Sequence, residues 1–409
     1  MKFSKISLTA AGILLGISGP VASDSGEGFK LFSDALLYAQ FRPRYEYADI
    51  DGGTDAANAL TNRTVLGAKF ANMASVKGLQ MNLEATNVSH FGVMDDYKPE
   101  QSDYDVIMDP SQTRMTQAHF TYSQAGTTVT AGRKMATFDN QRFIGHVGWR
   151  QMPQTYDLLL VTNNSIVKEL NLAAAYVKRV NRITEDGKLD TNSVLLHGTY
   201  AVAPALKLTG YGYMLASIHD TIGIRATGGQ NFSGAKVSYE AEYALQDKPS
   251  FEEETMGDIK PDQEAQYYKL AVKANYNSFV LSAAYEVLGE KEGDGGGAFS
   301  TPLATLHAMN GFADRFLKTP VKGLVDTNFT LGYIDKQLGK FLAFYHLFES
   351  DDGGDDYGSE LDLVYVPPKL NKHLGMMAKV AYYMEGDDAG TPVGDTTKIW
   401  LMLDYKFGF

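Results

Sequence analysis

The sequence contains no cysteine and only two tryptophans among its 409 residues. The lack of cysteine excludes a disulfide scaffold, a thiolate zinc site, a catalytic thiol and a lipid anchor on an N-terminal cysteine. Basic side chains are outnumbered, 37 Lys and Arg against 49 Asp and Glu, and the formal charge of −12 argues against a protein that binds nucleic acid. No stretch holds 18 uninterrupted apolar residues, so no transmembrane helix is expected.

The residues that are abundant point to a β-rich protein. Gly, Tyr and Phe number 40, 24 and 21, and 44% of the chain is hydrophobic. A chain this apolar and aromatic is too rich in core-forming residues to be disordered. Aromatic residues are favoured in strands, so sheet structure is expected over helices.

Residues 1–23 have the form of a bacterial export signal. Lys2 and Lys5 supply a positive n-region, residues 8–17 form an apolar stretch, and small residues follow as a cleavage site. The apolar stretch is shorter than the roughly 20 residues that a spanning helix needs, which disfavours a membrane anchor. We expect a mature chain of residues 24–409 whose formal charge is −14, because two Lys and no acidic residue are removed.

The rest of the chain alternates between apolar and polar side chains, the pattern of a strand with one apolar and one polar face. The pattern is clearest in residues 37–47, 79–86, 235–246, 268–276, 279–287 and 399–409. Strands of about 10 residues match those that cross a bilayer at a tilt and exceed the usual ~5–6 residues of soluble sheets. Their apolar faces often end in Tyr or Phe, which suits the aromatic girdles of a membrane barrel.

The connections distinguish a membrane barrel from the two soluble alternatives, a β-sandwich and a propeller. Tight turns at 203–205 and 336–339 alternate with long acidic loops at 95–110, 251–263, 289–326 and 351–356. Short turns on one side and long loops on the other are the outer-membrane arrangement. We therefore predict an all-β fold, a transmembrane antiparallel β-barrel of about 18 strands, with 16 as the alternative, short periplasmic turns and long extracellular loops.

The end of the chain carries a further signal. Residues 399–409 alternate strictly, and the chain stops at an aromatic residue. This ending resembles the C-terminal targeting strand of bacterial outer-membrane barrels, which the barrel assembly machinery reads, so Tyr405, Phe407 and Phe409 are the expected assembly signal. A closed barrel leaves no strand edge in hydrocarbon, and 16 to 18 strands are enough to enclose an aqueous channel.

Arginine is concentrated in the first half of the chain, where nine of the 11 Arg lie between positions 42 and 182. The alternation places five cations on the polar face, which would line the lumen: Arg42, Arg44, Arg63, Lys69 and Arg179. Such cations attract anions, and the guanidinium fork matches carboxylates and phosphates. Alternatively, these Arg pair with lumenal acids such as Glu46, Glu84 and Asp157 and stiffen the wall, and both roles are compatible at one constriction.

Residues 132–157 break the alternation with a dense mixture of Arg, aromatic and amide side chains. Within them, the stretches 139–145 (DNQRFIG), 149–151 (WRQ) and 154–157 (QTYD) resemble the alginate-export family of outer-membrane porins. Further similarity lies in residues 42–47 (RPRYEY), 63–64 (RT), 179–182 (RVNR) and 299–316. The resemblance therefore spans the mature chain.

This resemblance implies an 18-stranded monomeric barrel that passes anionic polysaccharide or smaller anionic solutes across the outer membrane of a Gram-negative bacterium. It also implies an Arg-lined constriction with lumenal cations at Arg133, Arg142, Arg150, Arg179 and Arg182. The expected partners are outer-membrane lipid, lipopolysaccharide, the barrel assembly machinery and the anionic solute. No cofactor is expected.

Other functions have weaker support. The acidic run at 351–356 lacks the spacing of a Ca²⁺ loop, so a solvated loop, bridged to lipopolysaccharide by divalent ions, is preferred over a Ca²⁺ site. The eight His are scattered, which disfavours a metal site, and no nucleophile is paired with a base, which disfavours an enzyme. A surface receptor or adhesin with a plugged lumen is the remaining alternative to an anion-selective, porin-like channel.

Overall fold

The computed structural model describes residues 31–250, 264–291, 297–388 and 393–408. The expected export signal at 1–23, the expected loop at 251–263 and the terminal Phe409 lie outside the described residues. Within the described residues, no helix is long and apolar enough to cross a membrane.

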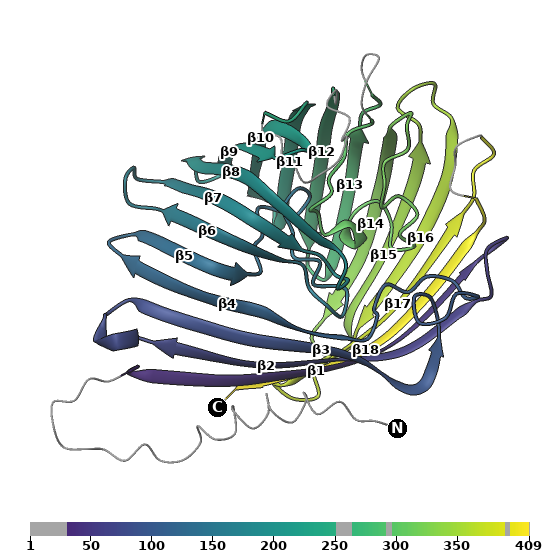
Figure 1. The fold of residues 1–409 in the computed structure, drawn as a ribbon. Coiled ribbons are helices and arrows are strands. Elements are labelled where there is room, and N and C mark those ends of the chain that lie inside the picture. The colour runs from purple at the N-terminus through teal and green to yellow at the C-terminus, as the bar shows by residue number, and fades with distance from the viewer. Residues whose placement is uncertain (1–30, 251–263, 292–296, 389–392, 409) are drawn as a thin grey trace.

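Eighteen strands form one antiparallel sheet in this part of the chain. Their bounds are β1 Asp34–Ile50, β2 Ala57–Ala71, β3 Leu79–Asp96, β4 Gln112–Gln124, β5 Thr127–Lys134, β6 Thr155–Asn163, β7 Leu170–Asn181, β8 Lys188–Ala203, β9 Leu206–Leu215, β10 His219–Phe232, β11 Ala235–Asp247, β12 Ala265–Tyr276, β13 Phe279–Leu288, β14 Leu324–Asp335, β15 Gly339–Glu349, β16 Asp356–Val366, β17 Leu374–Met384 and β18 Thr396–Gly408. Each strand pairs with its sequence neighbours, and β1 also pairs with β18, so the sheet closes into a barrel (Figure 1). The predicted 18-stranded antiparallel barrel is confirmed.

The two rims of the barrel differ as predicted. Short connections lie on what we call the turn rim, at 72–78, 125–126, 164–169, 204–205, 233–234, 277–278, 336–338 and 367–373. The opposite rim, the loop rim, carries the longer connections, among them 97–111, 135–154, 182–187, 289–323, 350–355 and 385–395. Both chain ends of the described barrel lie at the turn rim, where Gly408 of β18 pairs with Tyr38 of β1, four residues from the start of β1 at Asp34. Figure 1 shows β1 and β18 side by side.

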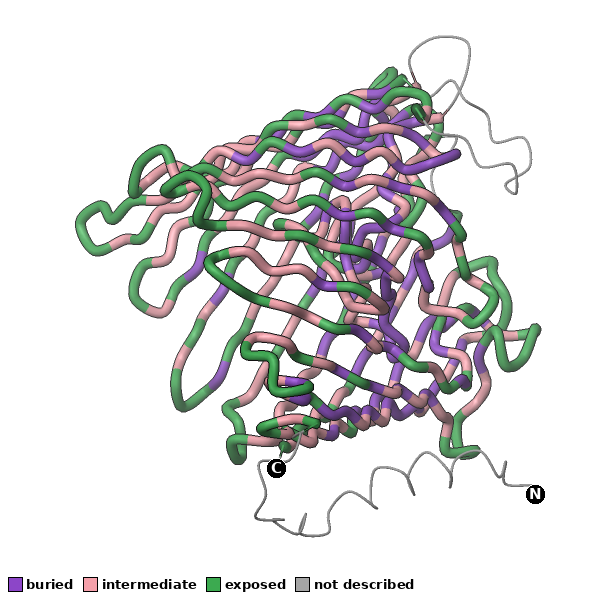
Figure 2. Tube along the Cα trace, turned by 60° about the vertical axis from the view of Figure 1, so that its left-hand side comes forward, coloured by how far each residue is buried: buried purple, intermediate pink, exposed green. Residues whose placement is uncertain are grey.

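The wall has an apolar outer face and a mixed inner face, because neighbouring residues of a strand point to opposite sides. Leu401 on β18 is 53% exposed, whereas its neighbour Trp400 is fully buried. Figure 2 shows buried positions alternating with half-buried and exposed ones along the strands, and the tips of the turns exposed. A barrel with its apolar side chains on the outside is suited to hydrocarbon, as the alternation predicted.

Two loop-rim connections fold into the barrel, a feature that the sequence did not predict. We call residues 135–154 the first inserted segment and residues 297–323 the second inserted segment. The Gly145 N–H donates to the Leu303 carbonyl at 2.8 Å, so the two segments touch each other. Ile144, Phe299 and Leu303 pack with wall residues in one buried apolar cluster. The lumen is therefore narrowed from within.

Candidate functional site

Two of the predicted lumenal arginines are fully engaged in buried ion pairs. Arg44 on β1 contacts Glu46 at 2.9 Å and also pairs with Asp109 of the 97–111 connection. Arg150 of the first inserted segment contacts Glu46 at 3.0 Å and Asp314 of the second inserted segment at 2.9 Å. Burial alone lowers the pKa of Arg150, but the surrounding carboxylates outweigh it and hold that pKa above its ordinary value. These charges fasten loops to the wall.

Arg142 has the same structural role at a second point. Its Nε lies 3.3 Å from Glu286 of β13, and its Nη2 donates to Asn310 of the second inserted segment at 3.0 Å. Asn310 donates in turn to Glu286 and to Asp326 of β14, at 3.0 Å each. Arg142 thus joins the first inserted segment, the second inserted segment and the wall, as the alternative of wall-stiffening arginines predicted.

Arg42 and Arg63 differ from these arginines. They face each other in the β1–β2 register, so both side chains lie on the inner face. Arg42 donates to the carbonyls of Gly148, Trp149 and Arg150 at 2.6 to 3.2 Å, yet no described carboxylate lies within ion-pair distance of it. Arg63 has no ion-pair partner among the described residues, and its Nε makes no hydrogen bond. We call Arg42 and Arg63 the basic pair.

The basic pair is an electrostatic anomaly. Like charges directly opposite each other on neighbouring strands destabilise a sheet, and a low-dielectric wall strengthens the repulsion. His146 of the first inserted segment does not relieve it: burial lowers its pKa, and Arg63 and Arg42 lower it further, so the ring is neutral at pH 7. A small anion placed here would remove the repulsion, which makes the basic pair the candidate anion site.

Lys69 and Glu84 also lie on the inner face, as predicted. Lys69 sits over the ring of Tyr38 with its Nζ 5.4 Å from the centroid, and no carboxylate pairs with it in the described chain. Glu84 accepts hydrogen bonds from the Tyr38 hydroxyl at 2.9 Å and from Thr116 at 2.7 Å. Because its oxygens are engaged by neutral donors, Glu84 does not form an ion pair with the basic pair or with Lys69.

Arg133 and Arg179 do not line the lumen, and this prediction is wrong. Tyr156 points inward, since its hydroxyl donates to Gly145 of the first inserted segment, so the adjacent Asp157 points outward. Arg133 pairs with Asp157 at 2.6 Å, and Arg179 lies opposite Asp157 in the register and pairs with Asp190. These ion pairs stand on the outer face of the wall near the loop rim.

Arg182 and Arg150 line a cavity of about 320 Å³. The cavity lies between the two inserted segments, the 97–111 and 182–187 connections and β18, and we call it the vestibule. Its walls combine apolar side chains with cations and one acid, among them Val106, Met108, Leu306, Arg315, Lys398 and Asp314. Arg182 has no ion-pair partner among the described residues, so an anion entering here meets an uncompensated positive charge.

A second cavity, of about 470 Å³, lies toward the turn rim. Hydroxyl and amide side chains dominate its lining, with Thr128, Thr162, Asn171 and Thr199 contributed by four successive strands. Phe138 of the first inserted segment also lines it. The two cavities therefore differ: the vestibule combines apolar walls with charged side chains, and the second cavity is lined mainly by neutral polar groups.

A buried lysine that the sequence did not predict joins both inserted segments to the wall. The Nζ of Lys379 on β17 lies 3.9 Å from the ring centroid of Trp149 and 3.5 Å from that of Phe312. It also lies 3.0 Å from the Nε2 of His307. Trp149 is stacked on His307 at 4.4 Å. No local signal predicts this contact, because the four residues come from three distant parts of the chain: Trp149, the pair His307 and Phe312, and Lys379.

The expected assembly signal is described in part. Tyr405 is 39% exposed on the outer face of β18, and the Phe407 ring is stacked on Phe41 of β1 at 6.1 Å.

In the acidic 350–355 connection, Asp355 pairs with Lys322 at 2.7 Å and Asp351 accepts from the Glu290 N–H. No group of three or more His, Asp or Glu in the described part of the chain is arranged to hold a metal ion.

Comparisons with known proteins relate the chain to solved barrels by fold. No family model matches the chain, and no curated protein matches it either. OccAB2 of Acinetobacter baumannii superposes with a TM-score of 0.71 at 17% identity, over 94% of this chain and 100% of that one. OccK8 (OprE) of Pseudomonas aeruginosa gives 0.69 at 14% identity, over 93% and 100%.

OpdK of Pseudomonas aeruginosa, solved with vanillate, gives a TM-score of 0.71 at 11% identity, over 93% of this chain and 100% of that one. At these identities the likeness shows the fold alone, an 18-stranded antiparallel β-barrel. The resemblance to the alginate-export family that the sequence suggested gains no support from these comparisons.

Proposed function

We propose that this protein is an outer-membrane channel of a Gram-negative bacterium that passes small anionic solutes. The observation that carries the proposal is the basic pair, two inward-facing arginines directly opposite each other with no carboxylate within ion-pair distance. Cations held inside a low-dielectric wall lower the barrier for anions and raise it for cations. The fold of the structural neighbours supports the membrane placement.

Unpaired cations mark a route through the interior. Arg182 stands at the vestibule, Arg63 at the middle of the wall and Lys69 six residues further along β2, close to the turn rim. At about 3.3 Å per residue, the step from Arg63 to Lys69 spans roughly 20 Å. An anion would therefore move from one positive charge to the next. Several separated, weak binding positions favour entry of the anion and do not trap it at a single deep site.

The solute class is a small carboxylate rather than a polymer. The inserted segments pack against each other through Gly145 and Leu303, and the vestibule holds about 320 Å³, room for one small molecule. Its apolar walls suit a carboxylate with an apolar body. OpdK was solved with vanillate, an aromatic carboxylate, which we therefore choose as a probe.

The remaining features follow from this placement. Residues 1–23 would direct export and be removed, and Tyr405, Phe407 and Phe409 would serve the barrel assembly machinery. The apolar outer face would contact membrane lipid, and the acidic loops would meet lipopolysaccharide. The barrel would act as a monomer, as a channel and not as an enzyme.

The test is the reversal potential of the mature protein in a planar bilayer under a KCl gradient. Arg63→Gln is expected to lower the chloride-to-potassium permeability ratio at least fivefold, since losing about 1 kcal/mol of favourable interaction at the barrier is a fivefold effect. Vanillate block should weaken in parallel. Arg179→Gln is the matched control, because it removes a guanidinium from the outer face, and its ratio should equal that of the wild type.

A folded barrel with no conductance would contradict the channel and favour a surface receptor with a plugged lumen. Folding is checked separately by heat-modifiable migration on gels. A conducting barrel with no preference for chloride, or one in which both Arg→Gln variants behave alike, would remove the basic pair from the mechanism while leaving a channel.

A further inference from the structure

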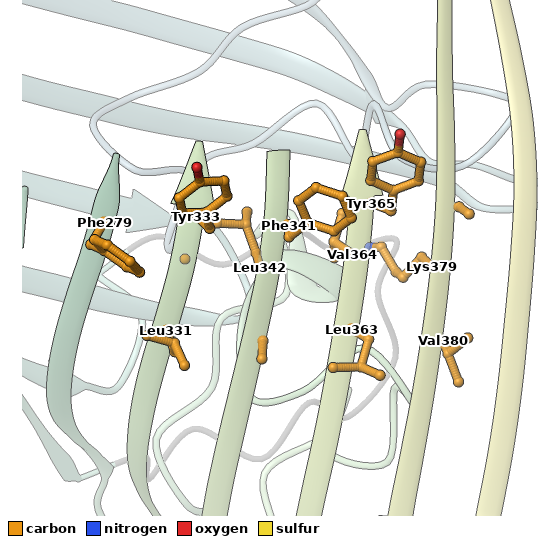
Figure 3. A pocket seen from close by; sticks show the side chains of 13 residues that line it. Phe279, Leu331, Tyr333, Phe341, Leu342, Leu363, Val364, Tyr365, Lys379 and Val380 are labelled. Atoms are coloured by element: carbon orange, nitrogen blue, oxygen red, sulfur yellow. The ribbon is translucent and has the colours of Figure 1, made fainter. Parts of the chain in front are cut away.

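The outer face of β13–β17 carries an apolar hollow of about 460 Å³ near the turn rim. Two rows of side chains line it (Figure 3). The row nearer the turn rim, in register across the five strands, is Phe279, Tyr333, Phe341, Tyr365 and Ala378. The second row, in register across β14–β17, is Leu331, Ala343, Leu363 and Val380.

Small residues make the hollow. Ala343 lies between Leu331 and Leu363 in the second row, and these two leucines are 57% and 46% exposed. The row nearer the turn rim is built from aromatic pairs, and the rings of Phe341 and Tyr365 are stacked with their centroids 4.5 Å apart. The Tyr365 hydroxyl donates to the Leu338 carbonyl at 3.1 Å, which ties the aromatic row to the turn above it. The result is an apolar recess under an aromatic edge.

The turns next to this hollow are basic. Lys336 lies in the 336–338 turn, and Lys369 and Lys372 lie in the turn that follows β16. All three are exposed, and none forms an ion pair with a described residue. The nearby Asp335 is occupied within its own turn, where it accepts the N–H groups of Gln337 and Leu338 at 2.7 and 2.8 Å.

The opposite ends of the same strands have the opposite charge. The 350–355 connection between β15 and β16 contains Asp351, Asp352 and Asp355, and the 385–395 connection between β17 and β18 contains four acidic residues. The hollow lies at the basic end. Lysines at a membrane surface attract anionic lipid headgroups. Within the described strands β13–β17, positive charge therefore lies next to the apolar hollow only on the turn-rim half of this face.

We propose that this hollow binds one acidic phospholipid from the leaflet on the turn side of the barrel. Its acyl chains lie in the recess over Ala343, its glycerol region rests on the aromatic row, and its phosphate meets Lys336, Lys369 and Lys372. The proposal goes beyond solute transport and rests only on the membrane placement. A second copy of the chain is disfavoured, because a two-fold axis along the membrane normal would bring the two basic turn clusters together.

The experiment is native mass spectrometry of the mature barrel, released from detergent after incubation with phosphatidylglycerol or with phosphatidylcholine of the same acyl chains. The wild type is expected to retain phosphatidylglycerol at least tenfold better. Replacing Lys336, Lys369 and Lys372 together with Gln should abolish this difference. Replacing Lys168, Lys207 and Lys236 with Gln, three other exposed lysines near the turn rim, should leave it intact.

A second variant tests the hollow itself. Ala343→Phe fills the recess and should lower retention of both lipids, whereas Ala174→Phe, on the exposed outer face of β7, should not. Equal retention of the two lipids by the wild type would overturn the proposal. So would oligomers of the barrel that Ala343→Phe dissociates, since the hollow would then be a contact between copies. Chloride preference in bilayers is measured on the triple Gln variant of Lys336, Lys369 and Lys372 and on Ala343→Phe, and should be unchanged in both.

Discussion

At the scale of single residues, the interior sorts its arginines by whether a carboxylate neutralises them. One group holds loops in place, because each of its arginines is neutralised by a carboxylate of the protein. Its members are Arg44, Arg142 and Arg150, and their partners are Glu46, Asp109, Asp314 and Glu286. Arg63, Lys69 and Arg182 have no such partner in the described chain, so their positive charge is available to a solute in the passage. Removing a neutralised charge should therefore cost stability, and removing an unpaired one should cost selectivity.

Glu46→Gln tests the first half of this distinction. The carboxylate of Glu46 lies 2.9 Å from the guanidinium of Arg44 and 3.0 Å from that of Arg150, and Glu46 is 99% shielded from solvent. Breaking a buried pair often costs 3–5 kcal/mol, but Asp109 and Asp314 remain as partners here, so we expect a loss of about 2 kcal/mol in the free energy of unfolding. Urea unfolding of the barrel in lipid vesicles measures it.

Asp190→Asn is the matched control for that measurement. Asp190 pairs with Arg179 on the outer face, where the two side chains are 52% and 40% exposed. Exposed pairs contribute about 0–1 kcal/mol, so this variant should unfold close to the wild type. Equal losses in the two variants would show that Glu46 does not fasten the inserted segment.

The residue scale also shows why Arg179 was predicted on the wrong face, whereas Arg133, expected from the family resemblance alone, lies on a strand that pairs without a register shift. The register shifts between Asp157 and Leu158 on β6 and between Val177 and Arg179 on β7. A β-bulge adds one residue and so reverses the facing of every side chain beyond it. Counting alternate positions along the sequence carries Arg179 to the inner face, whereas the bulge turns it to the outer face. Bulges leave no clear mark in a single sequence.

At the scale of elements, the second inserted segment is held by a neutral histidine. Burial lowers the pKa of His307 to about 3, although the carboxylate of Asp314 acts against it. At pH 7 the ring is therefore uncharged, so its Nδ1–H donates to Asp314 at 2.8 Å and its Nε2 accepts from Lys379 at 3.0 Å. Lys379 and Arg150 face the same ring and disfavour its protonation.

This arrangement predicts that docking of the segment weakens in acid. The pKa of His307 is about 3 when docked and ~6.5 when free, so docking is strongest above pH ~6.5 and weakens as the pH falls toward 3. Near pH 5 the loss is roughly 2 kcal/mol. Asp314, whose pKa is held below its ordinary value, stays ionised over this range.

Limited proteolysis of the second inserted segment at pH 7 and pH 5 measures the change, and cleavage should be faster at pH 5. His307→Asn removes the titrating ring and should make cleavage independent of pH in this range. His373→Asn, on the turn rim, should leave the wild-type pH dependence intact. Cleavage that does not change with pH in the wild type would contradict the neutral docked histidine.

At the scale of the whole molecule, the barrel wall could be predicted from the sequence, whereas the two inserted segments inside it could not. Alternation is a local pattern, so strands, rims and closure follow from runs such as 37–47 and 399–409. The inserted segments depend on contacts between distant residues, as when Arg42 binds carbonyl groups more than 100 positions away. The unusual composition of residues 132–157 marked the first inserted segment as different but did not show that it enters the barrel.

A final prediction separates the wall from its contents. Replacing residues 298–318 with a short Gly-Ser linker removes most of the second inserted segment without touching a strand. Because β13 and β14 remain paired and an 18-stranded wall is wide enough for an aqueous channel, the barrel should fold and its single-channel conductance should rise at least roughly twofold. The matched control removes residues 351–354 between β15 and β16, where the N–H groups of Asp351 and Asp352 bond the Lys322 carbonyl, outside the stretch deleted above, and it should leave conductance unchanged. An unchanged conductance after the larger deletion would mean that the first inserted segment alone limits the passage, and that the basic pair acts beneath it.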